Sequence, residues 1–348
     1  MKRLSVSIVV ILCLLLVGLS ITDNPTAWAK KPILLRNVVP SPPGDFPLTY
    51  FNDEMAKRFN KRAGGEYMME IHAGGALAKL PEYFDAVRIG AVEMACAPWA
   101  LFSFLNPRLG IIETPFLFQT TQGASAACKF LLPLYDEILQ EKFNAKGLNL
   151  YNPGGMHVYS SKPVKTLEDW KGLLAGAISP PSASMIKALG GSPVTIVWTD
   201  LYESLQKKVI DACCQGLHGA NNFGLFEICK YATIFYGVSG WNGFSINLDV
   251  WKKMPKNIQD ILIEEATIAG EWMCDLNDYR LEAEDIKRAR EMGVEVYILP
   301  KEERDRWEAM AASTIEKQMK SCGEFGQKVK RIADEMNEVY PYESNSYK

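Results

Sequence analysis

The residues with the greatest potential for chemistry are three cysteines around one histidine: Cys213, Cys214, His218 and Cys229. Zinc prefers thiolates and imidazoles, and a cysteine beside a base can act as a nucleophile. The spacing matches no zinc pattern, however, because adjacent cysteines rarely bind one ion. Free buried cysteine also behaves as a small apolar residue. We therefore expect no metal, no cofactor and no cysteine nucleophile.

Other kinds of catalytic site are also disfavoured. The histidines are His72, His157 and His218, and the sequence contains neither Gly-x-Ser-x-Gly nor His-Glu-x-x-His. An enzyme therefore stays a remote alternative to a binding protein. After residue 29 the chain keeps seven cysteines, so at least one thiol is free or paired between chains, and the connectivity of any disulfide is left open.

Residues 1–29 have the pattern of a secretory signal peptide: a basic start, an apolar run over 6–19 and a small-x-small site at 27–29. The apolar run is shorter than the roughly 20 residues that a membrane-spanning helix needs. We predict cleavage after Ala29 and an exported product. The chain has 348 residues, is 48% apolar and carries a net charge of −3, which predicts two domains and disfavours nucleic acid as a partner.

A binding site for a small molecule is expected around residues 165–216. This stretch alternates short apolar runs with short helical patterns, which predicts βαβ units on a parallel sheet. In such sheets ligands bind beyond the carboxyl ends of the strands, so we expect half of a binding site here. The predicted elements are the strands Leu173–Ile178, Val194–Trp198 and Val209–Gln215 and the helices Ser182–Leu189 and Thr199–Lys208.

A second βαβ set precedes it, and one long helix is expected to connect the two. Asn257–Met292 repeats apolar residues every three or four positions and predicts a helix of roughly 50 Å, long enough to cross two lobes. The remaining predicted elements are the strands 31–39, 67–72, 92–98 and 294–299 and the helices 49–63, 82–89, 301–320 and 328–338. A polar tail over 340–348 is expected to fray.

The order and spacing of several motifs resemble the solute-binding subunits of tripartite ATP-independent periplasmic (TRAP) transporters. The resemblance covers essentially all of residues 31–330. The motifs are HAGGAL at 72–77, FDAVRIGAVEM at 84–94, ETPFLF at 113–118, KTLEDWKG at 165–172, KALGGSPV at 187–194, YESLQ at 202–206 and Ile246-Asn247 with Trp251.

The resemblance implies an α/β, two-lobed periplasmic binding protein (Venus flytrap) in which a mixed, mostly parallel sheet flanked by helices forms each lobe. The lobes are expected at 30–153 plus about 241–280 (lobe I) and 154–240 plus about 281–348 (lobe II). It also implies a periplasmic receptor that closes on a small organic acid and delivers it to membrane-embedded TRAP permease subunits, as a monomer or a homodimer.

The arginine with which this family usually binds a ligand carboxylate is missing. By the family pattern its position is Gly176, and the position of a second, upstream arginine falls near Gly155. Three explanations are open. An anion could bind the start of the helix after Ser179, with Ser182 and Ser184 as added donors. The ligand could instead be neutral, zwitterionic or largely apolar. An arginine from elsewhere, such as Arg36 or Arg108, could reach the ligand.

The other candidate ligand contacts are mostly aromatic or amide side chains at strand ends and loops. Wide rings suit a planar or aromatic ligand, or cation–π contact with an ammonium group. The complete set of candidates is Phe46, Gly75, Trp99, Met156, His157, Tyr159, Gly176, Ser179, Ser182, Trp198, Gln215, Trp241 and Asn242.

Overall fold

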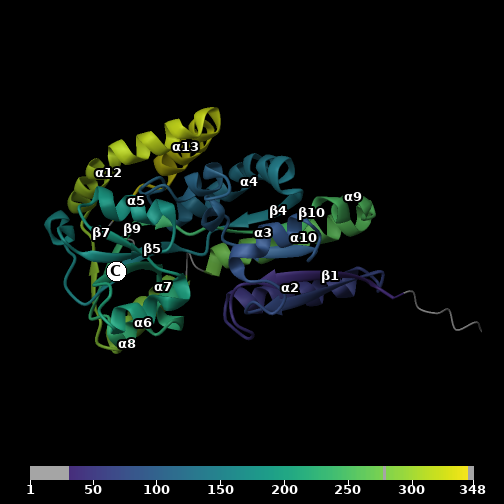
Figure 1. Cartoon of the computed structure of the whole chain (residues 1–348), viewed down its shortest axis with the longest axis horizontal. Helices are drawn as coiled ribbons and strands as arrows, with labels where there is room; N and C mark the ends of the chain where they lie inside the picture. Colours follow the sequence, from purple (N-terminus) through teal and green to yellow (C-terminus); the bar gives the residue numbers. More distant parts are fainter. Residues whose placement is uncertain (1–30, 277–279, 344–348) are drawn as a thin grey trace, which may run out of the picture.

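Two mixed β-sheets stand side by side in the computed structural model, which describes residues 31–276 and 280–343 (Figure 1). No helix in that part of the chain is both long and apolar enough to cross a membrane. The first sheet has the order β2-β1-β3-β10-β4, with β1 Ile33–Val39, β2 Tyr67–Ala73, β3 Met94–Ala97, β4 Ala145–Tyr151 and β10 Asn242–Asn247. The second has the order β11-β9-β5-β8-β6-β7, with β5 Gly155–Ser160, β6 Leu174–Ala177, β7 Ser192–Thr195, β8 Ala212–Gly216, β9 Tyr231–Ser239 and β11 Glu295–Ile298.

Both sheets combine a parallel part with antiparallel strands. In the first, β1 pairs parallel with β2 and β3, and β10 is antiparallel to β3 and β4. In the second, β6 is parallel to β7 and β8, β11 is parallel to β9, and β5 is antiparallel to β8 and β9. The antiparallel strands are the ones beside the crossings between the sheets. The expected two-lobed α/β architecture is confirmed.

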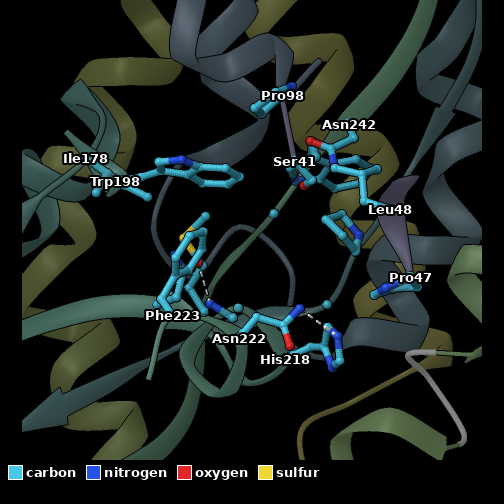
Figure 2. Close-up of a pocket in the computed structure, with 18 of the residues that line it drawn as sticks. Ser41, Pro47, Leu48, Pro98, Ile178, Trp198, His218, Asn222, Phe223 and Asn242 are labelled. Atoms are coloured by element: carbon cyan, nitrogen blue, oxygen red, sulfur yellow. Dashed lines mark hydrogen bonds between the residues drawn. The ribbon is translucent and has the colours of Figure 1, made fainter. Parts of the chain in front are cut away.

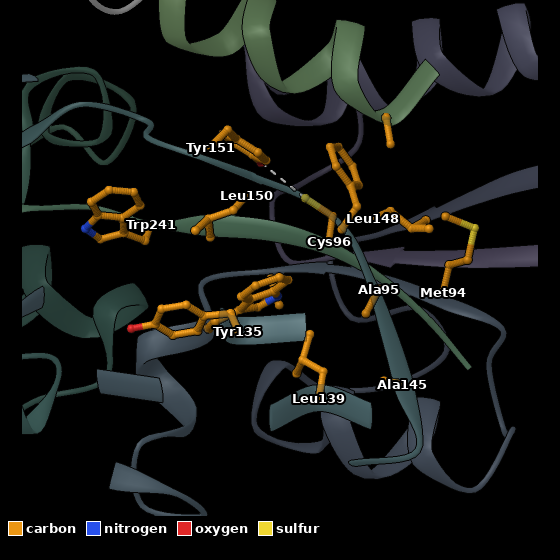
Figure 3. Close-up of a cluster of buried hydrophobic side chains, with 14 of the residues drawn as sticks. Met94, Ala95, Cys96, Tyr135, Leu139, Ala145, Leu148, Leu150, Tyr151 and Trp241 are labelled. Carbon is orange, nitrogen blue, oxygen red and sulfur yellow. Dashed lines mark hydrogen bonds between the residues drawn. The ribbon is translucent and has the colours of Figure 1, made fainter. Parts of the chain in front are cut away.

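Strands covered on both faces explain why β3 is a continuous apolar run rather than an alternating one. All four of its residues are buried. Helix α4 (Thr121–Phe143) brings Tyr135 and Leu139 to the core beside the sheet (Figure 3). The Cys96 sulfur lies 3.2 Å from the Tyr151 hydroxyl on β4. Cys96 is thus packed as a small core residue, and none of the seven cysteines in the described part of the chain forms a disulfide.

Helix α10 (Lys256–Leu276) is fixed to the first sheet by a buried carboxylate. Glu265 accepts from Arg58 Nε (2.6 Å) and Arg62 Nη1 (2.8 Å), both on α2 (Leu48–Arg62). A charge 2% exposed is tolerated because it is paired twice. Helix α11 (Glu282–Glu291) instead packs in the third apolar cluster, which lies against the second sheet. The predicted helix Asn257–Met292 therefore appears as two helices on two cores, and its residues 277–279 lie outside the described part.

Two backbone segments that cross between the sheets are tied together by one asparagine. They are the β4–β5 link at 152–154 and the β9–β10 link at 240–241. Buried Asn152 donates from Nδ2 to Gly240 O (2.8 Å) and accepts from Gly154 N–H (2.8 Å). Gly240 N–H donates to Gly154 O (3.0 Å). The two links thus lie in contact, and a hinge between the lobes has a defined place.

The two C-terminal helices pack on different apolar cores. Helix α12 (Lys301–Ser321) lies with the second core through Trp307 and Ala311. Helix α13 (Gly323–Val339), longer than the predicted 328–338, packs on α4 and buries Val329 and Ala333 in the first core. The remaining helices are α3 Tyr83–Arg88, α5 Pro180–Ala188, α6 Leu201–Gln206, α7 Leu217–Asn222, α8 Leu225–Ile228 and α9 Leu248–Lys253.

The packing of Trp99 against β10 gives a test of the first core. A Cβ on Gly243 would overlap the Trp99 ring and lie 2.9 Å from Asn149 O. Overpacking a rigid core costs about 1–3 kcal/mol, so Gly243→Ala should lower the free energy of unfolding by that amount. Gly216→Ala, whose Cβ would have no neighbour nearer than 3.8 Å, is the control in the same denaturant titrations. Equal stability of the two variants would contradict the position of Trp99.

Candidate functional site

A cavity of about 190 Å³ lies where the two sheets face each other (Figure 2). Its walls come from both sheets and from the crossing links. The lining residues are Ser41, Pro42, Asp45, Pro47, Leu48, Pro98, Leu101, Glu113, Pro153, Gly154, Met156, Ile178, Trp198, Gln215, Gly216, His218, Gly219, Asn222, Phe223, Gly240, Trp241, Asn242 and Met273.

The parallel strands direct their carboxyl ends at this cavity. Ile178 follows β6, Trp198 opens the turn after β7, and Gln215 and Gly216 end β8. On the first sheet, the segment 41–48 follows β1 and Pro98 follows β3. Ligand sites of α/β proteins lie at this edge because loops there converge from several strands.

The β1 loop is held in place by backbone hydrogen bonds. Gly74 N–H donates to Val39 O (3.0 Å) and Ser41 O (2.9 Å), and Thr49 Oγ1 donates to Pro42 O (2.8 Å). Gly74 has φ +65° and Gly75 has φ +82°, a conformation that glycine adopts at little cost. The glycine pair therefore supports the loop, and Gly75 lies outside the cavity lining.

The charge of the cavity is unusual for a site expected to take an acid. Among the described lining residues there is no lysine or arginine, and the titratable ones are Asp45, Glu113 and His218. Burial raises the pKa of Asp45, an effect only partly opposed by hydrogen bonds from Ser41 and Asn222 and by the charge of His218. A ligand carboxylate would thus meet two acidic side chains and no free cation.

Glu113 is the most deeply buried of these acids. It ends the 3₁₀ turn η3 (Pro107–Glu113) and is 2% exposed. Its hydrogen bond is from Ser179 Oγ to Oε2, at 3.4 Å. Burial raises the pKa of the Glu113 carboxyl to about 8, and the Ser179 hydroxyl opposes this weakly. At neutral pH the empty cavity therefore contains a mostly protonated carboxyl.

The start of α5, predicted to bind an anion, has its donors already in use. Ser182 N–H donates to Ser179 Oγ (3.3 Å), Ser179 N–H to Ser182 Oγ (3.0 Å) and Ala183 N–H to Ser179 O (3.0 Å). Pro180 and Pro181 have no N–H. The serine pair thus caps the helix, and the group nearest to it is the Glu113 carboxyl rather than open cavity.

The position of the missing arginine is filled by aliphatic side chains. A Cβ on Gly176 would lie 2.9 Å from Ile210 Cδ1 and 3.2 Å from Leu201 Cδ2. The two alternative arginines are engaged elsewhere. Arg36 donates from Nε and Nη2 to Glu93 (2.8 and 2.7 Å), and the Arg108 guanidinium lies 5.9 Å from the centre of the Phe325 ring.

Five of the predicted ligand contacts line the cavity, and eight do not. Met156, Trp198, Gln215, Trp241 and Asn242 are in its wall. The Gln215 side chain is fixed by its Oε1, which accepts from Gly216 N–H (2.9 Å), while Nε2 has no partner among the described residues. The eight that lie outside the lining are Phe46, Gly75, Trp99, His157, Tyr159, Gly176, Ser179 and Ser182.

Three of the eight are outside the lining because they are packed in the protein interior. Trp99 and Tyr159 are fully buried in the first and third apolar clusters. His157 is also fully buried, and neither ring nitrogen has a partner in the described part of the chain. Burial lowers the pKa of His157 to about 3. The ring is thus neutral and packs edge-on against Tyr236, 4.7 Å away.

Sequence reasoning missed several lining residues, and two of them form an interaction between the lobes. On α7, His218 Nε2 lies 2.6 Å from Phe46 O and Nδ1 lies 3.1 Å from Asp285 Oδ2. Asn222, one turn later, donates to Asp45 Oδ1 (3.0 Å) and Phe46 O (3.1 Å). We call these four residues, His218, Asn222, Asp45 and Phe46, the interlobe latch (Figure 2 shows His218 and Asn222). The sequence does contain a signal for this pair, because the i, i+4 spacing of His218 and Asn222 places both side chains on one face of a helix.

Metal binding has no support in the described residues, where no group of three or more His, Cys, Asp or Glu could hold an ion. The cysteines singled out in the sequence are buried, and burial raises the pKa of the Cys214 and Cys229 thiols to about 12. His218 instead belongs to the interlobe latch. The geometry is that of a binding cavity between two lobes.

Comparison with known proteins agrees with this geometry. Residues 42–321 match the model of bacterial extracellular solute-binding protein, family 7. The 2,3-diketo-L-gulonate-binding periplasmic protein YiaO of Escherichia coli (strain K12) is 27% identical over 69% of this chain and 75% of its own length. An extracytoplasmic solute receptor of Bordetella pertussis that binds pyroglutamic acid superposes with a TM-score of 0.78 at 18% identity, over 86% of this chain and 99% of its own.

A TRAP periplasmic solute-binding protein from Desulfovibrio salexigens with bound orotic acid gives a TM-score of 0.77 at 20% identity, over 88% of this chain and 99% of its own. At such identities the solved structures establish the fold. The family match covers most of the chain, from the β1 loop to the end of α12. The chain therefore belongs to family 7 of the bacterial extracellular solute-binding proteins, the periplasmic solute receptors of TRAP transporters.

Proposed function

We propose that this receptor binds a small organic solute without net negative charge in the interlobe cavity and delivers it to a TRAP permease. The observation that carries the proposal is the charge of the lining, with two carboxyl groups and no lysine or arginine among the described residues. A buried carboxylate needs a paired cation or several donors, and the described lining offers amide and indole donors but no lysine or arginine. Of the three explanations for the missing arginine, the geometry favours the neutral or zwitterionic ligand.

The apolar part of the wall supports the same choice. Trp198 and Phe223 pack with ring centres 5.3 Å apart, and Trp241, on the β9–β10 link, is also in the lining. Leu48, Leu101, Met156, Ile178 and Met273 fill much of the remaining wall. Such a surface binds an apolar or planar ligand body, while Gln215 and Asn242 supply directional hydrogen bonds. The acids named for the relatives are thus a poor fit to this cavity.

Closure around the ligand would use the interlobe latch. His218 Nδ1 lies beside the Asp285 carboxyl group, and Nε2 lies beside the Phe46 carbonyl (2.6 Å) and the Asn222 amide nitrogen (3.1 Å). In the proposed closed state Nε2 donates to the nearer group, the Phe46 carbonyl, and Nδ1 donates to Asp285, which makes the ring an imidazolium. The charge would stabilise the closed state across the cavity mouth, and a bound ligand would select that state.

The proposal extends to the lobes and to the location of the protein. Lobe I comprises the first sheet with α2, α4, α10 and α13, and lobe II comprises the second sheet with α5 to α8, α11 and α12. The N-terminal segment directs export, and the predicted cleavage after Ala29 lies outside the described residues. No chemical step on the ligand is part of this function.

Ligand screening by thermal unfolding tests the charge preference. Small neutral, zwitterionic and ammonium compounds should include ones that raise the melting temperature, because a ligand that binds only the folded state stabilises it. Matched carboxylates should stabilise least. Titration calorimetry should then give one site per chain, and the recovered ligand should be chemically unchanged. A carboxylate as the strongest stabiliser would contradict the proposed ligand class, and conversion of the ligand would contradict a receptor.

The latch predicts a pH dependence of stability. Burial lowers the pKa of His218, but the hydrogen bonds to Asp285 and Phe46 O and the charges of Asp285 and Asp45 raise it more, so the net shift is upward. Because the folded pKa exceeds the unfolded one, the stabilisation is complete below about pH 6.5 and is lost as the pH rises through the folded value.

His218→Gln should therefore lower the free energy of unfolding by about 1.5–3 kcal/mol at pH 6, the range for a charged hydrogen bond, and by less at pH 9. Denaturant titrations of both proteins across this range give the difference at each pH. A difference that grows with pH, or none at pH 6, would contradict a charged His218.

A further inference from the structure

We infer that Glu113 determines specificity by pairing its carboxylate with a protonated nitrogen of the ligand, so that the solute is a small organic amine with an apolar body. This inference rests on the proposed function and narrows its ligand class. It concerns a carboxyl group in the cavity wall that accepts one hydrogen bond from the described residues.

Glu113 accepts fewer hydrogen bonds from the described residues than an ionised carboxylate can accept. An ionised carboxylate accepts about four hydrogen bonds, whereas Glu113 accepts one, at 3.4 Å from Ser179 Oγ, among the described residues. Its Oε1 has no hydrogen bond to that part of the chain. Acids this deeply buried are normally paired with a cation, as Glu265 is with Arg58 and Arg62. The unfilled capacity of Glu113 lies at the cavity, where a ligand can reach it.

The fold offers no internal cation as a substitute. The one basic side chain in the lining, His218, already bridges Asp285 and Phe46 O. Asp45, the second acid of the lining, adds negative charge at the same cavity when it ionises. An ammonium group is therefore the ligand group that lowers the electrostatic energy of this cavity, whereas a carboxylate raises it.

The neighbouring rings suit the same group. Trp198, Phe223 and Trp241 line the cavity, and a cation over the face of an indole gains about 0.5–2 kcal/mol. Gln215 Nε2, on a side chain 6% exposed, has no acceptor in the described part of the chain. A ligand oxygen placed there would satisfy it. The combined surface fits an amine on an aromatic or aliphatic body, with an oxygen acceptor at the far end.

Binding of such a ligand would release a proton. Without a ligand, the buried Glu113 carboxyl is mostly protonated at neutral pH. Burial raises its pKa more than the hydrogen bond from the Ser179 hydroxyl lowers it. The titratable groups around it are Tyr135, on which it acts electrostatically, and Asp45 and His218 across the cavity. When the ammonium arrives with its own protons, the Glu113 proton leaves to solvent and the ion pair forms. The affinity should therefore rise with pH, by up to tenfold per unit, until Glu113 is ionised without ligand.

The experiment compares three probes that share one ring: benzylamine, benzyl alcohol and benzoate. In titration calorimetry at pH 7, the wild type should bind benzylamine at least about tenfold more tightly than benzyl alcohol, an ion pair with Glu113 being worth 1.4 kcal/mol or more. Benzoate should bind most weakly. Repeating the benzylamine titration in two buffers of different ionisation enthalpy should show release of most of one proton.

Glu113→Gln removes the charge and keeps the shape. It should bind benzyl alcohol as the wild type does, lose the preference for benzylamine and release no proton. Glu141→Gln, which changes an exposed acid on α4, is the control with the same charge change and should behave as the wild type. Should Glu113→Gln not fold, the wild-type preference and proton release decide the question.

The outcomes separate this inference from the proposed function. Equal binding of benzylamine and benzyl alcohol, an unchanged preference in Glu113→Gln, or no binding of benzylamine would each overturn the role of Glu113. With benzoate weakest, the proposed function would survive that result. Benzoate as the tightest ligand would overturn both.

Discussion

The carboxamide of Asn152 is the interaction on which the arrangement of the molecule depends. Its Nδ2 donates to Gly240 O and so joins the two segments that cross from one sheet to the other, while its Oδ1 accepts from Gly154 N–H within its own segment. Because both crossings are fixed at one point, the carboxyl ends of strands on the two sheets face each other there rather than elsewhere. The crossing residues Pro153, Gly154, Gly240 and Trp241 then become the floor of the cavity. A local hydrogen bond thus defines where a ligand can contact both lobes at once.

The charge of that cavity follows from where the fold uses its arginines and its helix ends. Arg58 and Arg62 bind α2 to α10, and Arg304, 1% exposed, donates to the backbone of β9 at Phe235 O (3.1 Å). The α5 start has two prolines where N–H donors would be, and its serines bind each other. These arginines and this helix N-terminus are therefore engaged in structural interactions. The cavity lining retains two acidic side chains without a lysine or arginine beside them.

The sequence predicted the architecture better than the site, for a physical reason. Periodicity and motif order are properties of many residues together, so βαβ units and the two-lobed fold could be inferred. Whether one side chain at a strand end points to a cavity or to a core depends on details of register that periodicity does not contain. Met156 and His157 are neighbours on β5, yet one lines the cavity and the other is buried beside Tyr236. Glu113 was part of the motif at 113–118, but the motif did not predict a place in the cavity, because that depends on the burial and direction of one side chain.

The two titratable groups of the site act in opposite directions, and together they define when the receptor can work. A charged His218 favours closure, so closure weakens as the pH rises. An ionised Glu113 favours the cationic ligand, so recognition weakens as the pH falls. His218 titrates above its usual range and Glu113, at about 8, far above its own, so both shifts move the groups toward the same interval. On these proposals, recognition and closure would both depend on protonation in the cavity, in opposite directions.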